Sequence, residues 1–179
     1  MKILVEMLTE QTQSLKTQYI DRTVEWANLE YDRCLKMVKW EESDWCKYLG
    51  IEPAVKKVTD YKTGQRVDRL GFPKGFWNRK ESKTYDTQLN RVRSVLKIGR
   101  ESYISKEKKF AELHYESSIS KLADRIQKKD LNHSNLEVTT SHIGPNIDTV
   151  ITDGNKTVRA FTIIASGDVQ RPHYRYLVK

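Results

Sequence analysis

The chain has 179 residues, with 32 lysines and arginines against 24 aspartates and glutamates, and its net charge is +8. This length holds one or two small domains and excludes a large multidomain enzyme. Hydrophobic residues make up 37% of the chain and charged residues 31%, a balance typical of elongated helical proteins with much surface for little core. Residues 74–129 contain 15 basic and 7 acidic side chains, whereas 1–73 and 130–179 are each balanced, so the middle segment supplies the whole excess.

Residues 2–48 are predicted to form one long helix, with or without a break. No Pro or Gly precedes Gly50, and apolar side chains recur at spacings of three, four or seven. These positions are Leu8, Leu15, Ile20, Val24, Ala27, Tyr31, Leu35 and Val38.

Residues 50–83 interrupt the helical pattern. A turn signal around Gly64, flanked by Val58 and Val67, predicts a small β-hairpin. The segment that follows, 70–80, reads as a loop that mixes aromatic and cationic side chains.

A second helical run is predicted over residues 84–129. Its apolar stripe is close to heptad spacing and consists of Tyr85, Leu89, Val92, Leu96, Gly99, Tyr103, Phe110 and Leu113. Two narrow stripes of similar length are buried most simply by an antiparallel, coiled-coil-like helical hairpin.

After residue 130 the pattern changes to the alternation of β-strands. Four short strands are predicted, over Leu136–Ser141, Asp148–Thr152, Thr157–Ala165 and Tyr174–Val178, with a tight turn at Gly154. A sheet of this size needs a helix over one face, and Leu4, Met7 and Leu8 are well placed to supply it. The predicted fold is therefore α+β, with a helical hairpin over 1–129 that carries an insertion at about 50–83, and an antiparallel sheet over 130–179.

No strong catalytic motif is present, and we expect neither an enzyme nor a bound metal or cofactor. A hydrolase would need His133, His142 and Asp148 to converge, but their spacing matches no ligand pattern, and turn chemistry explains the local Asp and Asn residues. No apolar run is long enough to span a membrane, the acidic Glu6 comes too early for a signal peptide, and the two cysteines favour reduced thiols in a cytosol.

The basic segment offers a candidate binding row. On one continuous helix, four cations fall within about 80° of one another, which suits a phosphate backbone. The alternative is a solvated helix face whose cations pair with Glu101, Glu107, Glu112 or Glu116. The four cations are Arg93, Lys97, Arg100 and Lys108.

Two further segments are candidate partner-binding or nucleic-acid-binding sites. In the loop, aromatic rings among cations can stack on bases or anchor a protein interface, although at least two of the three rings are expected to fold back over Trp40, Trp45 and Tyr48. In the tail, strand alternation places three basic side chains on one face, which also suits a defended edge strand. The residues are Phe72, Lys74, Phe76, Trp77, Arg79 and Lys80 in the loop, and Arg171, His173 and Arg175 in the tail.

The ending Val169–Lys179, which contains the run Arg171-Pro172-His173-Tyr174-Arg175, resembles the C-terminus of a group of small bacteriophage proteins, as does Thr162–Gly167 before it. The resemblance covers about the last 25 residues and carries no catalytic residues. It implies a phage origin and action in the cytoplasm of a bacterial host. Small phage proteins without enzyme motifs resemble anti-defence factors, including anti-CRISPR proteins.

We therefore expect a non-enzymatic inhibitor that binds a host defence nucleoprotein or its RNA, with an RNA-guided effector complex as the target. The basic helix and the aromatic-basic loop would make the contact. Two alternatives stay open: a phage protein that binds single-stranded nucleic acid, and a virion structural or assembly protein. The sequence does not define the oligomeric state.

Overall fold

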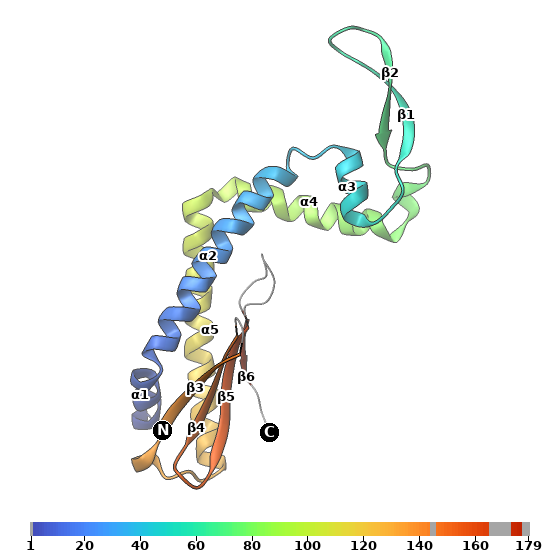
Figure 1. Cartoon of the computed structure of the whole chain (residues 1–179). Coiled ribbons are helices and arrows are strands. Elements are labelled where there is room, and N and C mark those ends of the chain that lie inside the picture. Colours follow the sequence, from blue (N-terminus) through green and yellow to red (C-terminus); the bar gives the residue numbers. More distant parts are fainter. Residues whose placement is uncertain (1, 144–145, 165–172, 177–179) are drawn as a thin grey trace. The chain divides into compact units, whose positions relative to one another are not determined.

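A computed structural model describes residues 2–143, 146–164 and 173–176, and the fold is α+β, as predicted (Figure 1). Within these residues, five α-helices accompany a two-stranded and a four-stranded sheet. In chain order the elements are α1 (Lys2–Gln11), α2 (Gln13–Met37), α3 (Glu42–Leu49), β1 (Ala54–Thr59), β2 (Arg66–Gly71), the 3-10 helix η1 (Phe76–Asn78), α4 (Lys80–Ile98), α5 (Arg100–Lys128), the 3-10 helix η2 (His133–Asn135), β3 (Glu137–Ile143), β4 (Asn146–Thr152), β5 (Thr157–Ile164) and β6 (His173–Tyr176).

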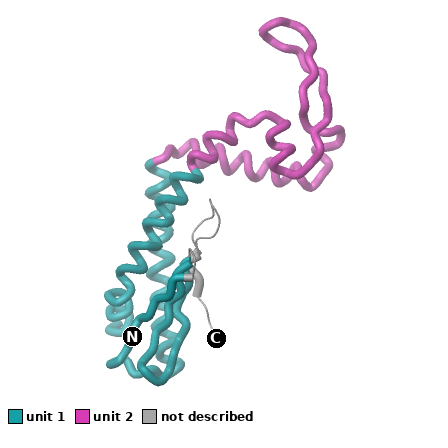
Figure 2. Tube along the Cα trace, viewed as in Figure 1, with its two compact units in different colours: residues 1–30, 101–179 teal, residues 31–100 magenta. Residues whose placement is uncertain are grey.

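The chain divides into two compact units (Figure 2). Unit 1 comprises residues 1–30 and 101–179, and unit 2 comprises Tyr31–Arg100. Unit 1 is therefore built from two separated stretches of sequence, and unit 2 is a continuous insertion between them. This division differs from the predicted one at residue 130, because the strands after that point share a core with the helices before it.

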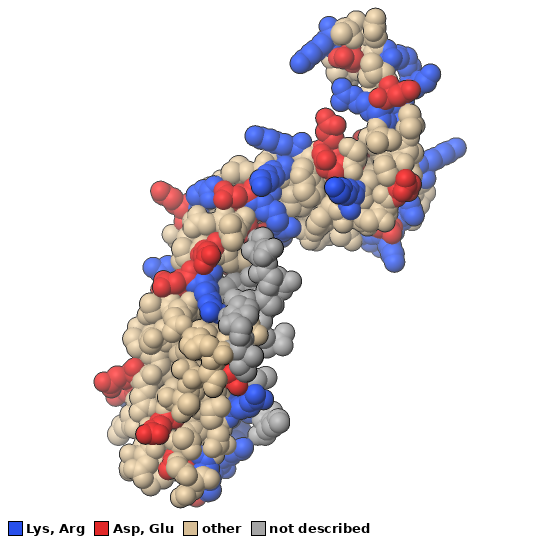
Figure 3. Space-filling model, in the orientation of Figure 1, with Lys and Arg blue, Asp and Glu red and all other residues tan. Residues whose placement is uncertain are grey.

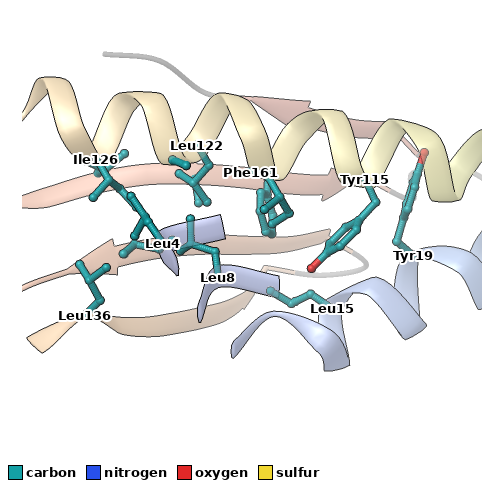
Figure 4. Close-up of a cluster of buried hydrophobic side chains, with 14 of the residues drawn as sticks. Leu4, Leu8, Leu15, Tyr19, Tyr115, Leu122, Ile126, Leu136 and Phe161 are labelled. Carbon is teal, nitrogen blue, oxygen red and sulfur yellow. The ribbon is translucent and has the colours of Figure 1, made fainter. Parts of the chain in front are cut away.

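The core of unit 1 joins α1, α2 and α5 to the four-stranded sheet (Figure 4). Each helix contributes one apolar stripe, and the sheet contributes its inward-facing side chains. The prediction that the first helix covers the sheet is confirmed for Leu4 and Leu8, whereas Met7 is only partly buried. The side chains labelled in Figure 4 are Leu4, Leu8, Leu15, Tyr19, Tyr115, Leu122, Ile126, Leu136 and Phe161.

Within unit 1, α2 runs antiparallel to α5. The hydroxyl of Thr12, just before α2, is hydrogen-bonded to the hydroxyl of Tyr115. Farther along α2, the ring of Trp26 lies 6.3 Å from the ring of Tyr103. Residues later in α2 therefore contact residues earlier in α5, as in an antiparallel pair.

The four strands lie in the order β3-β4-β5-β6, and every neighbouring pair is antiparallel. Their bounds agree closely with the predicted strands, although the last residues of the third and fourth predicted strands lie outside the described residues. A β-bulge between Thr149 and Val150 changes the pairing with β5. As a result, Ala160 and Phe161 are adjacent in sequence and both are buried, which simple alternation does not predict.

The turn between β4 and β5 is held by Asp153. Its carboxylate accepts hydrogen bonds from three backbone N–H groups: those of Asn155 at 2.9 Å, Lys156 at 2.6 Å and Asn132 at 2.8 Å. These bonds favour the charged form and lower the pKa of Asp153 from 3.8 to about 2. The carboxylate thus ties η2 to the β4–β5 turn.

Because this pKa is lower in the folded state, the stabilisation by Asp153 is complete above pH 4 or so and disappears as the pH falls toward about 2. We expect Asp153→Asn to lower the melting temperature at pH 7, and the gap from the unmodified protein to close over that acidic range. Thermal unfolding followed by circular dichroism at several pH values measures this. Asp124→Asn, at an exposed position of α5, is the control, and an equal effect of both changes would contradict the role of Asp153.

Both predicted helical runs are broken. The first ends at Met37, and α3 begins anew at Glu42, where the N–H of Glu41 donates to the Asp44 carboxylate at 3.0 Å and acidic residues occupy the first turn. The second is interrupted at Gly99, whose φ of 88° is a conformation that glycine adopts readily and other residues rarely do. A break in the first run was one of the two predicted possibilities, whereas the prediction that the second run is continuous is wrong at Gly99.

The buried faces of the helices also differ from the predicted stripes. Phe110 and Leu113 of α5 are exposed, as are Leu35 of α2 and Val38 just after it. Because α5 begins anew after Gly99, its buried face is rotated relative to the stripe predicted for a continuous helix. Some buried positions are also occupied by polar residues, which a search for apolar residues does not find. Buried positions of the two helices include Tyr19, Thr23, Trp26, Glu30, Cys34, Met37, Tyr103, Ala111, Tyr115, Ser118 and Ile119.

Unit 2 contains the end of α2, α3, the β1–β2 hairpin and α4. The predicted hairpin is confirmed, with six antiparallel residue pairs from Ala54 opposite Gly71 to Thr59 opposite Arg66. Glu42 of α3 holds its base, because one carboxylate oxygen accepts from Lys56 Nζ at 3.1 Å and from the backbone N–H of Phe72 at 2.9 Å. The hairpin is thereby fixed to α3.

Candidate nucleic-acid interface

The net charge of the protein resides in unit 2. Its residues include 17 lysines and arginines and 9 aspartates and glutamates, whereas unit 1 has 15 of each. The division into units thus separates a neutral body from one with a charge of +8. Figure 3 shows Lys and Arg side chains projecting from the β1–β2 hairpin on the face in view. A polyanion would be attracted to unit 2 rather than to the protein as a whole.

The loop after β2 buries two of its three aromatic rings. Phe72 and Phe76 stack face to face with ring centroids 3.9 Å apart, and both contact Tyr85 of α4. Tyr85 in turn meets Trp45 of α3 at 4.9 Å. Two rings fold inward as expected, and Tyr85 is the residue that joins them to Trp45 of α3. Phe72 and Phe76 are unable to stack on bases in this arrangement.

Trp77 is the ring of this loop that faces solvent. Its side chain is 63% exposed, although one edge rests on Phe72, Phe76 and Tyr85. Large rings are rarely left this accessible, and an aromatic face supported from behind is suited to stacking on a partner. Trp77 is therefore the aromatic residue of the predicted site that remains available.

The cations of the loop lie on both sides of Trp77 in the sequence, with Lys74 before it and Arg79 and Lys80 after it. Lys74 and Lys80 are exposed, and Lys80 begins α4. Arg79 lies 3.8 Å from the Glu81 carboxylate, but its side chain is about half exposed. Such an exposed ion pair is weak, so Arg79 can exchange that partner for a phosphate.

The predicted row of four cations does not lie on one helix. Arg93 and Lys97 are exposed on α4, Arg100 follows the break at Gly99, and Lys108 lies on α5 in unit 1. Arg100 pairs with Asp32, and its guanidinium lies 4.6 Å from the centre of the Tyr31 ring. Arg100 therefore has a structural role within unit 2. Arg93 and Lys97 are exposed, and their role in binding stays a prediction.

Arg93 is close enough to the aromatic cluster for its charge to act there. Burial raises the pKa of Tyr85, and the positive charge of Arg93 opposes that rise. The charge of Arg93 therefore acts on Tyr85, the ring that Phe72 and Phe76 contact.

A polar stripe on α4 was missed by the sequence analysis. Its members recur every three or four residues, all are exposed, and none is acidic. Polar residues at this spacing predict one face of a helix, just as apolar residues do. The stripe consists of Lys83, Thr87, Asn90, Ser94 and Lys97.

The tail is described only in part. Arg171 lies outside the described residues, and β6 carries His173 opposite Ile164 and Arg175 opposite Thr162. The predicted strand at this place is confirmed by its pairing with β5. The orientation of its side chains lies outside the described part, so their role in binding stays a prediction.

The three residues that a hydrolase would need, His133, His142 and Asp148, lie in different elements. Asp148 accepts from Thr162 at 3.0 Å and from Arg159 at 3.2 Å, while His133 lies in η2 and His142 in β3. In the ranges 2–143, 146–164 and 173–176, no group of three or more His, Cys, Asp or Glu side chains is arranged to hold a metal ion. Among the helices of these same ranges, none combines the length and apolar character that crossing a bilayer requires.

Comparison with known proteins adds nothing to this geometry. The chain matches no protein-family model, no curated protein and no solved structure. The function is therefore argued from the charge, exposure and contacts of unit 2.

Proposed function

We propose that this protein is a non-enzymatic binding protein whose unit 2 contacts the phosphates of a nucleoprotein, and that the partner is an RNA-guided defence complex of a bacterial host. The observation that carries the proposal is the separation of charge, with +8 on unit 2 and none on unit 1. A unit without net charge has little long-range attraction for a polyanion, so binding would be directed to unit 2.

The contact surface of this proposal is the loop and the outer side of α4. Lys74, Lys80, Arg93 and Lys97 are exposed and would meet phosphates, while Trp77 offers a ring for an unpaired base or an apolar protein pocket. The alternative of a binder for single strands is weakened, because Phe72 and Phe76 are buried and one ring is a small stacking platform. Phosphate contact within a nucleoprotein does not depend on those two rings.

Two finer features belong to the same proposal. The helices of both runs would pair as an antiparallel hairpin with coiled-coil spacing, which is supported in unit 1 by the contacts of Tyr115 and Tyr103 with the first run. The site of action would be the cytoplasm of an infected bacterial cell, as the resemblance of the C-terminal segment implies.

The proposal predicts that Lys80→Glu, Arg93→Glu and Lys97→Glu, combined in one variant, reduce affinity for RNA at least about tenfold at about 0.15 M salt. The slope of log affinity against log salt should fall by about two to three, because about 0.7 to 0.9 is lost per phosphate contact. Fluorescence anisotropy of a labelled RNA measures both quantities. The matched control makes the same charge change on exposed lysines of unit 1, with Lys106→Glu, Lys109→Glu and Lys128→Glu.

An equal loss of affinity in the two variants would overturn the assignment to unit 2. The nature of the partner is tested separately by capture from cells that carry an RNA-guided defence complex. The unmodified protein should retain the complex more tightly than the bare RNA, and the unit 2 variant should not retain it. Retention of bare RNA alone would favour the general nucleic-acid binder.

A further inference from the structure

The β1–β2 hairpin, residues 54–71, presents a face that no other part of the described chain covers. The side chains at alternate positions divide into two faces. On one face, Lys56 and Arg69 turn toward α3, where they lie 3.1 Å and 3.9 Å from the carboxylates of Glu42 and Glu41. The other face carries the cross-strand pairs Val55 with Leu70, Lys57 with Asp68, and Thr59 with Arg66.

This second face is exposed along its whole length, including its apolar pair. Val55 is 68% exposed and Leu70 is 52% exposed, although they lie directly opposite each other. A two-stranded ribbon is at best marginally stable by itself in water, and large apolar side chains paired on its surface mark a place where something binds. In this ribbon Val58, Val67, Asp60 and residues at the base are partly or fully buried, and the other side chains are exposed.

The outer half of the ribbon is positively charged. Lys57, Lys62 and Arg66 lie there, against Asp60, whose carboxylate accepts from the N–H of Lys62 at 2.9 Å, and Asp68, which lies opposite Lys57. Over residues 54–71 the chain has five basic and two acidic residues. This positive charge attracts a polyanion and repels a basic surface.

The tip adds groups that can read base edges. Tyr61 is fully exposed, and Thr59, Thr63 and Gln65 supply hydroxyl and amide groups at exposed positions beside it. Base edges are recognised by donors and acceptors of this kind, whereas the flanking cations meet phosphates. The ribbon thus displays cations, hydrogen-bonding groups and an apolar pair, and its two strands project from α3 and α4 within unit 2 (Figure 1).

We propose that the β1–β2 ribbon inserts into the major groove of duplex DNA. Two strands lie about 4.8 Å apart, and with side chains they fit a groove about 12 Å wide. The major groove of duplex RNA is deep and narrow and does not admit such an element. This inference rests on the proposed function in one respect, namely that unit 2 meets nucleic acid, and it names the form of nucleic acid that the ribbon selects.

The test compares duplex DNA, duplex RNA of the same sequence and the single DNA strand as anisotropy probes for the full chain. The unmodified protein should prefer duplex DNA over duplex RNA by about tenfold or more. The ribbon variant Lys57→Glu, Lys62→Glu, Arg66→Glu should lose that preference. The matched control Lys36→Glu, Lys39→Glu, Lys47→Glu changes the charge of unit 2 equally at exposed positions off the ribbon, and should keep the preference while all affinities decline.

The outcomes separate this inference from the proposed function. If the protein binds RNA or single strands but does not prefer duplex DNA, the ribbon inference fails and the proposed function stands. If the ribbon and control variants lower all affinities in parallel, the ribbon acts only through its charge and the inference again fails. If no probe binds, the ribbon inference fails, and capture of the defence complex decides the proposed function by itself. Unchanged circular dichroism of both variants shows that folding is intact.

Discussion

Phe161→Ala should lower the free energy of unfolding of unit 1 by about 3–5 kcal/mol, the range for removing a fully buried ring. Phe161 of β5 is completely buried, and α1, α2, α5 and the sheet all contribute to the cluster around it. The cavity would lie where these elements meet, so the surrounding side chains have little freedom to collapse into it. Hydrogen exchange of peptides from β4 and β5, read by mass spectrometry, reports the stability of this unit separately from unit 2.

The matched control is Phe110→Ala on α5. Phe110 is 60% exposed, and its replacement should cost less than about 1 kcal/mol. The two changes delete the same side chain from the same unit, so the difference between them isolates burial. A cost for Phe110→Ala as large as that for Phe161→Ala would mean that the predicted stripe through Phe110, and not the observed face through Tyr115, is the buried one.

Phe76→Ala should destabilise unit 2 by about 3–5 kcal/mol. Phe76 is 1% exposed, stacks on Phe72 and meets Tyr85, so its loss opens the cluster that fastens the loop to α4. Denaturant unfolding followed by tryptophan fluorescence measures this change, because three of the four tryptophans belong to unit 2. Nucleic-acid affinity should also fall, since the loop cations lose their support.

The neighbouring change Trp77→Ala separates folding from binding. Because Trp77 is mostly exposed, its removal should cost about 1 kcal/mol of stability, yet it should weaken binding of single-stranded RNA by about 1 kcal/mol or more if the ring stacks on a base. Trp40 and Trp45 remain as fluorescence probes. Equal destabilisation by Phe76→Ala and Trp77→Ala would contradict the finding that the Phe76 ring is buried and the Trp77 ring is exposed.

The strands and the hairpin could be predicted from sequence because their signals are local. Alternating side chains between Leu136 and Ile164, and the turns at Gly64 and Gly154, determine the strand type without reference to the rest of the chain. The two Val residues beside the first turn, Val58 and Val67, face each other as expected. The predicted α+β class followed from these signals together with the long helical patterns.

The breaks and faces of the helices could not be predicted in the same way. A helical pattern continues across Gly99 when positions are counted on a wheel, but the backbone there leaves the helical region and the count restarts. Thr23 and Glu30 are buried although they are polar, so a search for apolar residues passes over them. The bulge at Ala160 likewise depends on how β5 pairs with β4, and the sequence of β5 alone does not determine that pairing.

The candidate site shows the same limit. Its exposed cations are visible in the sequence, but Arg93 and Arg100 differ only in their surroundings: Arg100 has Asp32 and Tyr31 as partners. The charge was correctly seen to be uneven, yet residues 74–129 cut across both units. Only long-range contacts reveal that residues 31–100 form the basic body.

The insertion of unit 2 between the two stretches of unit 1 has a consequence for the order of events during synthesis. Unit 2 is complete once Arg100 has been made, and its contacts close loops within one continuous stretch. Leu4, Leu8 and Leu15 have no core to join until α5 and the strands have followed, a delay on the order of 10 s at ordinary rates of translation. The neutral unit therefore starts to be made before unit 2, but its core is complete only after unit 2 has been made.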